Sequence, residues 1–178
     1  FTDHEGPIET ERTTGYVSDL VTKANGRFDG ARISIGHTRW ATHGGVTDTN
    51  AHPHSSNDGT ISIVHNGIIE NASELLERVR NLGYQVHSET DSELIVHLLD
   101  YELKTQPSDK TPLDAFNSTV SLLRGSWAIA VIITGLEAIL VARNGAPLIV
   151  GRGHDLICIS SDVQPFFGGC SQVAYMND

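Results

Sequence analysis

Residues 61–103, ISIVHNGIIENASELLERVRNLGYQVHSETDSELIVHLLDYEL, carry the pattern that decides the fold. The apolar run at 61–64 predicts a strand, and Asn66-Gly67 is typical of the turn that ends one. Asn71 and Glu74 have the spacing of a capping box, which predicts a helix that closes at Gly83. This part of the chain is therefore expected to begin as a strand and continue as a helix.

A second helix is predicted further along the same stretch. A short strand is expected near 85–87, after which Asp91 or Ser92 can cap the helix. The apolar residues that follow form one stripe at helical spacing, and they are Leu94, Ile95, Leu98, Leu99 and Leu103.

The flanking sequence adds one helix on each side and several strands. Before residue 61, the spacing of apolar residues predicts a helix at 17–24, and alternation predicts a strand at 32–36. The long loop that follows, up to Pro53, is of a kind that is usually functional. Pro112 opens a further predicted helix that ends near Gly125. Strands are then expected at 127–133, 138–143, 148–151, 156–160 and 172–176.

These elements predict an α+β sandwich of packed sheets and helices rather than a doubly wound βαβ fold. The last expected strand is still in progress near Asp178, so we expect the domain to continue beyond it.

Composition narrows the class of protein. The chain has 178 residues, 39% of them apolar, and a formal net charge of −10. Such a charge opposes nucleic-acid binding, which depends on Lys and Arg neutralising phosphates. No apolar run approaches the roughly 20 residues that span a bilayer. We therefore expect a cytoplasmic protein, acting on a small molecule, with no nucleic-acid or membrane partner.

The two cysteines are not expected to react. Two cysteines cannot form a disulfide framework. Cys158 lies in an apolar run and is expected in the core, where free cysteines are common. Cys170 has no neighbouring His or cation in sequence to lower the pKa of its thiol.

Three short motifs supply groups that can hold an amino acid by both ends. The Arg39 guanidinium matches a carboxylate in bidentate fashion, although Arg39 could equally form a structural ion pair. Asn66 and Gly67 offer an amide N–H and a backbone N–H for an oxyanion, although the pair could be a simple turn. Asp91 could pair with an ammonium, although it could serve only as a helix N-cap.

Histidine spacing does not support a metal site. The chain contains nine histidines, including His52 and His54 on either side of Pro53. None of the spacings matches a His-Glu-x-x-His or Cys/His zinc pattern, so no metal and no cofactor is expected. Structural histidines that form hydrogen bonds are the better default.

Four segments together resemble the glutaminase domain of the glucosamine-6-phosphate synthases, a class II glutamine amidotransferase family. They are GHTRWATHG at 36–44, NAHPH at 50–54, HNGIIEN at 65–71 and SETDSE at 88–93. Weaker matches at LRGSWA (123–128), GAPL (145–148) and SSD (160–162) extend the resemblance over nearly the whole chain. The order and the spacing of the segments both fit.

The resemblance implies an N-terminal-nucleophile hydrolase fold, an αββα four-layer sandwich that is incomplete at both ends here. It implies that Arg39 binds the glutamine α-carboxylate, Asp91 the α-ammonium, and that Asn66 and Gly67 form the oxyanion hole. It further implies that Trp40, Thr42 and His43 lie in a loop that closes over glutamine, with His52 as a nearby support.

In that family the nucleophile is an N-terminal cysteine, and its own amine is the general base. Phe1 cannot serve, so residues 1–178 are expected to be a partial glutaminase domain that lacks this cysteine and the sugar isomerase domains, and to be inactive alone. The full-length enzyme would use glutamine and fructose 6-phosphate to make glucosamine 6-phosphate, and a homo-oligomer would be consistent with it. The alternatives are a degenerate glutamine-binding module, or the glutaminase domain of another class II amidotransferase.

Overall fold

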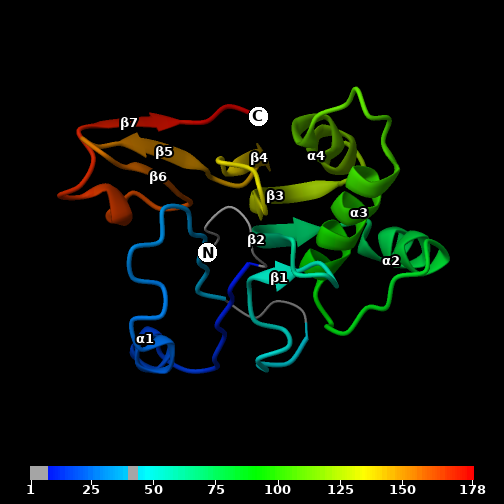
Figure 1. Cartoon of the computed structure of the whole chain (residues 1–178), viewed down its shortest axis with the longest axis horizontal. Helices are drawn as coiled ribbons and strands as arrows, with labels where there is room; N and C mark the ends of the chain where they lie inside the picture. The colour runs from blue at the N-terminus through cyan, green and yellow to red at the C-terminus, as the bar shows by residue number, and fades with distance from the viewer. Residues whose placement is uncertain (1–7, 40–43) are drawn as a thin grey trace.

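A four-stranded antiparallel sheet forms the centre of the molecule. The structure is a computed structural model, and it describes residues 8–39 and 44–178 (Figure 1). The strands are β1 (His54–Ser55), β2 (Ile61–Ile69), β3 (Gly125–Ile133) and β4 (Leu140–Asn144), and they lie in that order. The register of β2 and β3 pairs Ile61 with Ile133 and Ile69 with Gly125, so the longest two strands align along their full length.

Three helices cover one face of this sheet, namely α2 (Ala72–Asn81), α3 (Asp91–Thr105) and α4 (Pro112–Val120). Alternate side chains of β2 and β3 point into the helix layer, where Ile63 and Val131 are fully buried. Helix α3 lies between the other two, and its residues from Ser92 to Asp100 are all buried. The apolar stripe predicted for this helix therefore underestimates its burial, because α2 and α4 pack beside it.

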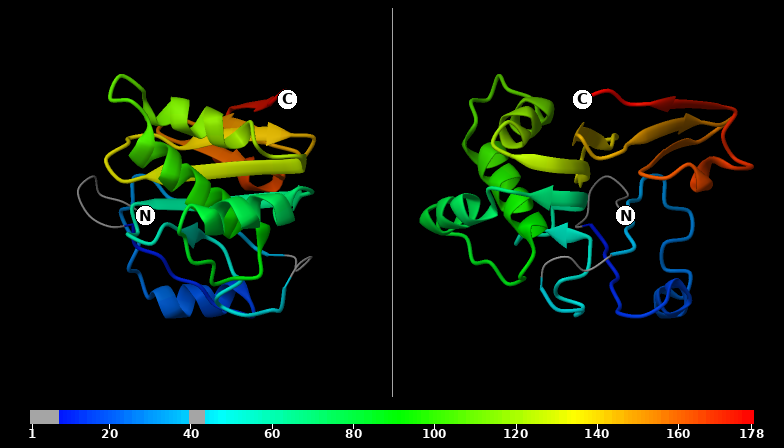
Figure 2. Two further views of the ribbon diagram at one scale, coloured as in Figure 1. Left: turned by 90° about the vertical axis from the view of Figure 1, so that its right-hand side faces the viewer. Right: turned by 180° about the vertical axis from the view of Figure 1, so that it is seen from behind.

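A second sheet lies on the other side of the first. It contains β5 (Ile149–Arg152), β6 (Ile157–Ser160) and β7 (Gln172–Tyr175), and β5 is the middle strand. The short helix η1 (Gln164–Phe166) follows β6 and precedes β7 in the chain. Figures 1 and 2 show α2–α4 at one end, β5–β7 at the other, and β2 and β3 between them. The helix α1 (Val17–Ala24) has no buried residue. These layers confirm the α+β prediction and form the helix–sheet–sheet part of an αββα sandwich.

Two predicted strands are wrong. The segment 32–36 forms no strand, because β1 takes the edge of β2 at Ser62 and Ile63. The segment 85–87 forms none either, because the backbone N–H groups of His87 and Ser88 donate to the Glu93 carboxylate. A strand needs a free edge as well as an alternating sequence.

The caps and the end of β2 also differ from the prediction. Strand β2 does not end at Asn66-Gly67 but continues to Ile69, with Gly67 paired to Trp127. The Asn71 side chain forms no cap bond; it bridges the Leu122 carbonyl and the Arg124 N–H at 3.0 Å each. The N-cap residue of α3 is Thr90, so Asp91 is already the first helical residue.

Cys158 is half-buried rather than a core residue. It lies on β6, which is an edge strand of the three-stranded sheet in the part of the chain that the structure describes. In the described part of the chain, none of the helices is long and apolar enough to cross a membrane.

Candidate functional site

A cavity of about 270 Å³ lies where β2, the first turn of α3 and the segment before residue 40 meet. It brings together Arg39, Asn66, Gly67 and Asp91, which sequence analysis proposed from three separate motifs, and His52, which the family resemblance implied. The remaining lining residues are His37, Thr38, His65, Ile68, Thr90 and Ser92. Trp40, Thr42 and His43 lie outside the described residues.

Asp91 is held at the cavity wall by the sheet. The backbone N–H of Ile69, on β2, donates to Asp91 Oδ2 at 2.9 Å. Its side chain is only 13% exposed, and it stands in the first turn of α3, where the helix dipole favours a negative charge. Asp91 thus presents a fixed carboxylate to the cavity and does not act as the N-cap.

Asn66 and Gly67 are neighbours on β2, and both are exposed at the cavity. Gly67 has a φ of 125°, a conformation that L-residues rarely adopt. A Cβ at this position would clash with the Ser126 carbonyl oxygen and would lie 2.8 Å from Trp127 Cα. Glycine is therefore required both by the backbone angle and by the close approach of β3.

Arg39 belongs to another part of the cavity wall, in a segment held by polar contacts. Its Nη1 donates to the Gly45 carbonyl at 3.0 Å, and the Gly45 N–H donates to Glu89 Oε2 at 2.9 Å. Asn50, which is buried, donates from Nδ2 to both Gly45 O and Glu89 Oε2 and accepts from the Glu89 N–H. The hydrogen bonds from Gly45 and Asn50 lower the pKa of Glu89, so the Glu89 side chain that they hold is an anionic carboxylate.

Neutral histidines surround the base of the cavity. The rings of His37 and His52 lie 4.3 Å apart, and those of His52 and His54 lie 5.0 Å apart. Burial, reinforced by neighbouring positive groups, lowers the pKa of His52 to about 2 and the pKa of His37 and of His54 to about 4. Among the described residues, no three His, Cys, Asp or Glu side chains are arranged to hold a metal ion.

Sequence reasoning assigned no role in the site to Ser92, Asn50 or Glu89. The Ser92 hydroxyl is 2.8 Å from His52 Nε2 and 2.9 Å from His65 Nδ1, and Asn50 and Glu89 fix the Arg39 segment. All three residues occur inside the segments that carry the family resemblance. Ser92 lies 40 and 27 residues from His52 and His65, and Asn50 lies 39 residues from Glu89, so no local spacing signals these contacts.

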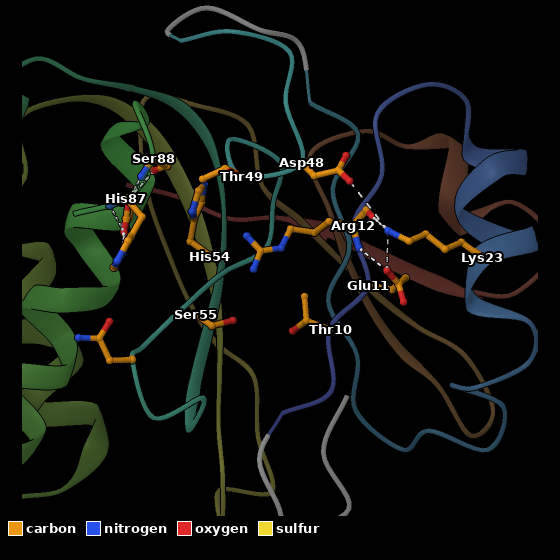
Figure 3. Close-up of a pocket in the computed structure, with 12 residues that line it drawn as sticks. Thr10, Glu11, Arg12, Lys23, Asp48, Thr49, His54, Ser55, His87 and Ser88 are labelled. Atoms are coloured by element: carbon orange, nitrogen blue, oxygen red, sulfur yellow. Dashed lines mark hydrogen bonds and ion pairs between the residues drawn. The ribbon is translucent and has the colours of Figure 1, made fainter. Parts of the chain in front are cut away.

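A second, larger cavity of about 490 Å³ lies nearby, lined by both cationic and anionic side chains (Figure 3). Its charges are largely paired, since Lys23 Nζ lies 2.9 Å from Glu11 and 3.9 Å from Asp48. Glu93 on its wall accepts hydrogen bonds from His87 and Ser88. None of the predicted site residues that the structure describes lines this cavity, so the smaller one is the candidate site.

Comparisons with known proteins identify the family of the chain. The family model described as "Glutamine amidotransferase domain" matches residues 37–168. The glutamine–fructose-6-phosphate aminotransferase [isomerizing] of Pyrococcus horikoshii is 39% identical over 178 residues, and that of Neisseria meningitidis serogroup A is 42% identical over 175. The matches cover 99% and 98% of this chain but only 29% and 28% of those relatives. The chain thus spans less than a third of their length.

Two solved structures share the fold. A glutamine phosphoribosylpyrophosphate amidotransferase from B. subtilis, complexed with ADP and GMP, has a TM-score of 0.62 and 26% identity, over 79% of this chain and 29% of that chain. A structure described as the allosteric regulatory enzyme of purine biosynthesis has a TM-score of 0.62 and 28% identity, over 79% of this chain and 30% of that one. With the family match over residues 37–168, the chain belongs to the glutamine amidotransferase domain family.

Proposed function

We propose that this chain is the glutamine-hydrolysing domain of an enzyme that makes glucosamine 6-phosphate from fructose 6-phosphate. The observation that carries the proposal is the single cavity that joins Arg39, the Asn66-Gly67 pair and Asp91. The shared name of the relatives, glutamine–fructose-6-phosphate aminotransferase, supports the choice of acceptor. Residues 1–178 would then be one domain of a longer enzyme, with sugar isomerase domains elsewhere.

The cavity offers opposite charges for the two ends of an amino acid. Arg39 would take the glutamine α-carboxylate through its planar fork of donors. Asp91 would take the α-ammonium, because its carboxylate is fixed by the Ile69 N–H. Trp40, Thr42 and His43 would close over the bound substrate, and His52 would support the site from behind.

The side-chain amide would then reach Asn66 and Gly67. A thiolate adds to the amide carbon, and its oxygen becomes an oxyanion that the Asn66 amide N–H and the Gly67 backbone N–H stabilise. The C–N bond breaks as the nitrogen takes up a proton, releasing ammonia, and water hydrolyses the thioester to give glutamate. Neither Cys158 nor Cys170 is among the described residues that line the cavity, so the proposed thiolate belongs to the rest of the enzyme. The cytoplasmic location and the homo-oligomeric state of the full-length enzyme remain predictions.

The test is an assay of the complete native polypeptide with glutamine and fructose 6-phosphate. Equal amounts of glutamate and glucosamine 6-phosphate are expected. Glutamate without the amino sugar would indicate an amidotransferase with another acceptor, and binding of glutamine without glutamate would indicate a degenerate module.

The Asn66→Ala variant tests the oxyanion role in the same assay. We expect kcat with glutamine to fall by about 10²–10³, with little change in KM, because one oxyanion donor is lost. Activity with added ammonia should persist. Unchanged glutamine turnover would remove Asn66 from the mechanism. Asn117→Ala, a change at an exposed residue of α4, is the matched control.

A further inference from the structure

Ser92 joins three parts of the chain behind the cavity. It is the second residue of α3, is 1% exposed, and lines the candidate site. Its Oγ lies 2.8 Å from His52 Nε2, in the segment before β1, and 2.9 Å from His65 Nδ1, on β2. It also lies 3.4 Å from Asp91 Oδ1. None of the roles proposed above uses this hydroxyl.

A hydroxyl has only one proton to donate, so its three neighbours cannot all accept from it. Of the three, His65 Nδ1 lies 3.6 Å from Asp91 Oδ1, and this carboxylate oxygen determines whether Nδ1 carries a proton. A lone pair on His65 Nδ1 would face the carboxylate and repel it, whereas an N–H there attracts it. His65 therefore carries its proton on Nδ1 and donates it to Ser92 Oγ.

The Ser92 proton can then go to His52 Nε2 or, over the longer distance, to Asp91 Oδ1. Both arrangements leave the proton on His65 Nδ1, 3.6 Å from Asp91 Oδ1, but only the second also places the Ser92 hydrogen on that oxygen, and it is the one that avoids a lone pair facing the carboxylate. The other carboxylate oxygen, Oδ2, is already fixed by the Ile69 N–H. When Ser92 donates to Asp91 Oδ1, the carboxylate is held at both of its oxygens before any ligand arrives.

We propose that Ser92 is a positioning residue, whose hydroxyl, together with the His65 ring, holds Asp91 in the orientation that receives a substrate ammonium. The inference rests on the proposed function, since it assigns Asp91 to the α-ammonium of glutamine. A carboxylate that is already oriented loses less conformational freedom when the ligand binds, which strengthens binding. Ser92 acts through Asp91 and does not itself touch the substrate.

The test uses two ligands that differ only in the ammonium group. Glutamate and glutarate are not hydrolysed, and glutarate lacks the α-ammonium. Their dissociation constants would be measured by calorimetry on the native polypeptide that contains this chain. For Ser92→Ala we expect glutamate to bind about tenfold more weakly and glutarate to bind unchanged. Ser92→Thr keeps the hydroxyl and should restore glutamate binding.

Ser62→Ala is the control, because Ser62 is a fully buried serine on β2 that does not line the cavity. It should leave both constants unchanged. In the ¹⁵N-histidine NMR spectrum of the native polypeptide, His65 should be protonated at Nδ1, and Ser92→Ala should reduce that preference while Ser62→Ala keeps it.

Three results would overturn the inference: unchanged glutamate binding by Ser92→Ala, equal weakening of glutamate and glutarate, or a His65 proton on Nε2 in the unmodified chain. Failure of the proposed function would look different. In that case the unmodified native polypeptide would bind neither glutamate nor glutamine.

Discussion

The two sides of the candidate cavity are built in different ways. On one side, Gly67 belongs to a strand of the central ladder, and Asp91 begins a helix whose next nine residues are all buried. On the other side, Arg39 belongs to a segment without strand or helix, held through Gly45 by the buried Asn50 and the anionic Glu89. Changes on the first side should therefore affect the whole fold, and changes on the second should act through a few hydrogen bonds.

The difference also separates the proposed chemical roles. The proposed oxyanion donors and the proposed ammonium site lie on the side that the hydrophobic core fixes. The carboxylate site lies on the side that polar contacts fix, next to residues 40–43 of the proposed closing loop. Groups that must be placed accurately for catalysis thus lie on the better-supported side.

The largest expected effect on stability is that of Gly67→Ala on the ladder side. We expect a loss of about 3 kcal/mol or more in the free energy of unfolding, because the methyl group meets the β3 backbone and φ is positive. Gly83→Ala is the control, since Gly83 also has positive φ but nothing lies within 4 Å of the added Cβ. It should cost about 1–2 kcal/mol. Equal losses in urea unfolding would contradict the close packing of β2 on β3.

A smaller loss is expected for Asn50→Ala on the loop side. The change leaves the Gly45 carbonyl, the Glu89 carboxylate and the Glu89 N–H without this partner, which should cost about 2 kcal/mol in urea unfolding. Asn117→Ala on the exposed face of α4 should change the stability by no more than about 0.5 kcal/mol. A loss as large as that for Gly67→Ala would show that the loop side is also part of the core.

The smallest effect is a pH dependence of stability that arises from the buried histidine His54, whose ring lies 5.0 Å from that of His52. The folded-state pKa of His54 is about 4, below the ordinary 6.5, so below pH 6.5 the unfolded chain binds a proton that the folded chain does not. Stability should therefore fall as the pH falls from 6.5 toward 4. His54→Gln should make this slope shallower by about 1 kcal/mol per pH unit between pH 6 and pH 5.

His154→Gln is the matched control for that slope, because the His154 side chain is 96% exposed. The measurement is urea unfolding at pH 7, 6 and 5. An unchanged slope for His54→Gln would mean that His54 titrates in the folded protein as it does in the unfolded chain.

Sequence patterns correctly predicted those helices and strands that depend on residues close together in the sequence. The helix that contains the apolar stripe from Leu94 and the strand at 127–133 were located correctly, because runs of apolar residues mark both of these buried elements. The strand predicted at 32–36 was wrong because alternation does not show whether a sheet edge is free. The strand-ending turn assigned to Asn66-Gly67 was wrong because Gly67 pairs with Trp127 on β3, which lies far along the chain.

The residues of the candidate site also divide into those that sequence could propose and those that it could not. Arg39, Asn66, Gly67 and Asp91 could be proposed because each has a recognisable chemical function at a motif. Ser92 and Asn50 could not, because serine and asparagine are common, and their roles come from His52 and Glu89, which lie 40 and 39 residues away. Contacts between distant segments become visible only when the fold is known.

The central claim is that Asp91 and Arg39 hold the two charged ends of one ligand, and a set of three ligands tests it most directly. Glutamate carries both groups, glutarate lacks the α-ammonium, and 4-aminobutanoate lacks the α-carboxylate. Dissociation constants would be measured by calorimetry on the native polypeptide, with Asp155→Asn, at an exposed carboxylate, as the control.

Asp91→Asn should weaken glutamate binding about 100-fold and leave glutarate within about twofold. Arg39→Lys should weaken glutamate and glutarate about tenfold and leave 4-aminobutanoate within about twofold. If Asp91→Asn weakened glutamate and glutarate equally, or Arg39→Lys weakened 4-aminobutanoate as much as glutamate, the two residues would not hold opposite ends of the ligand.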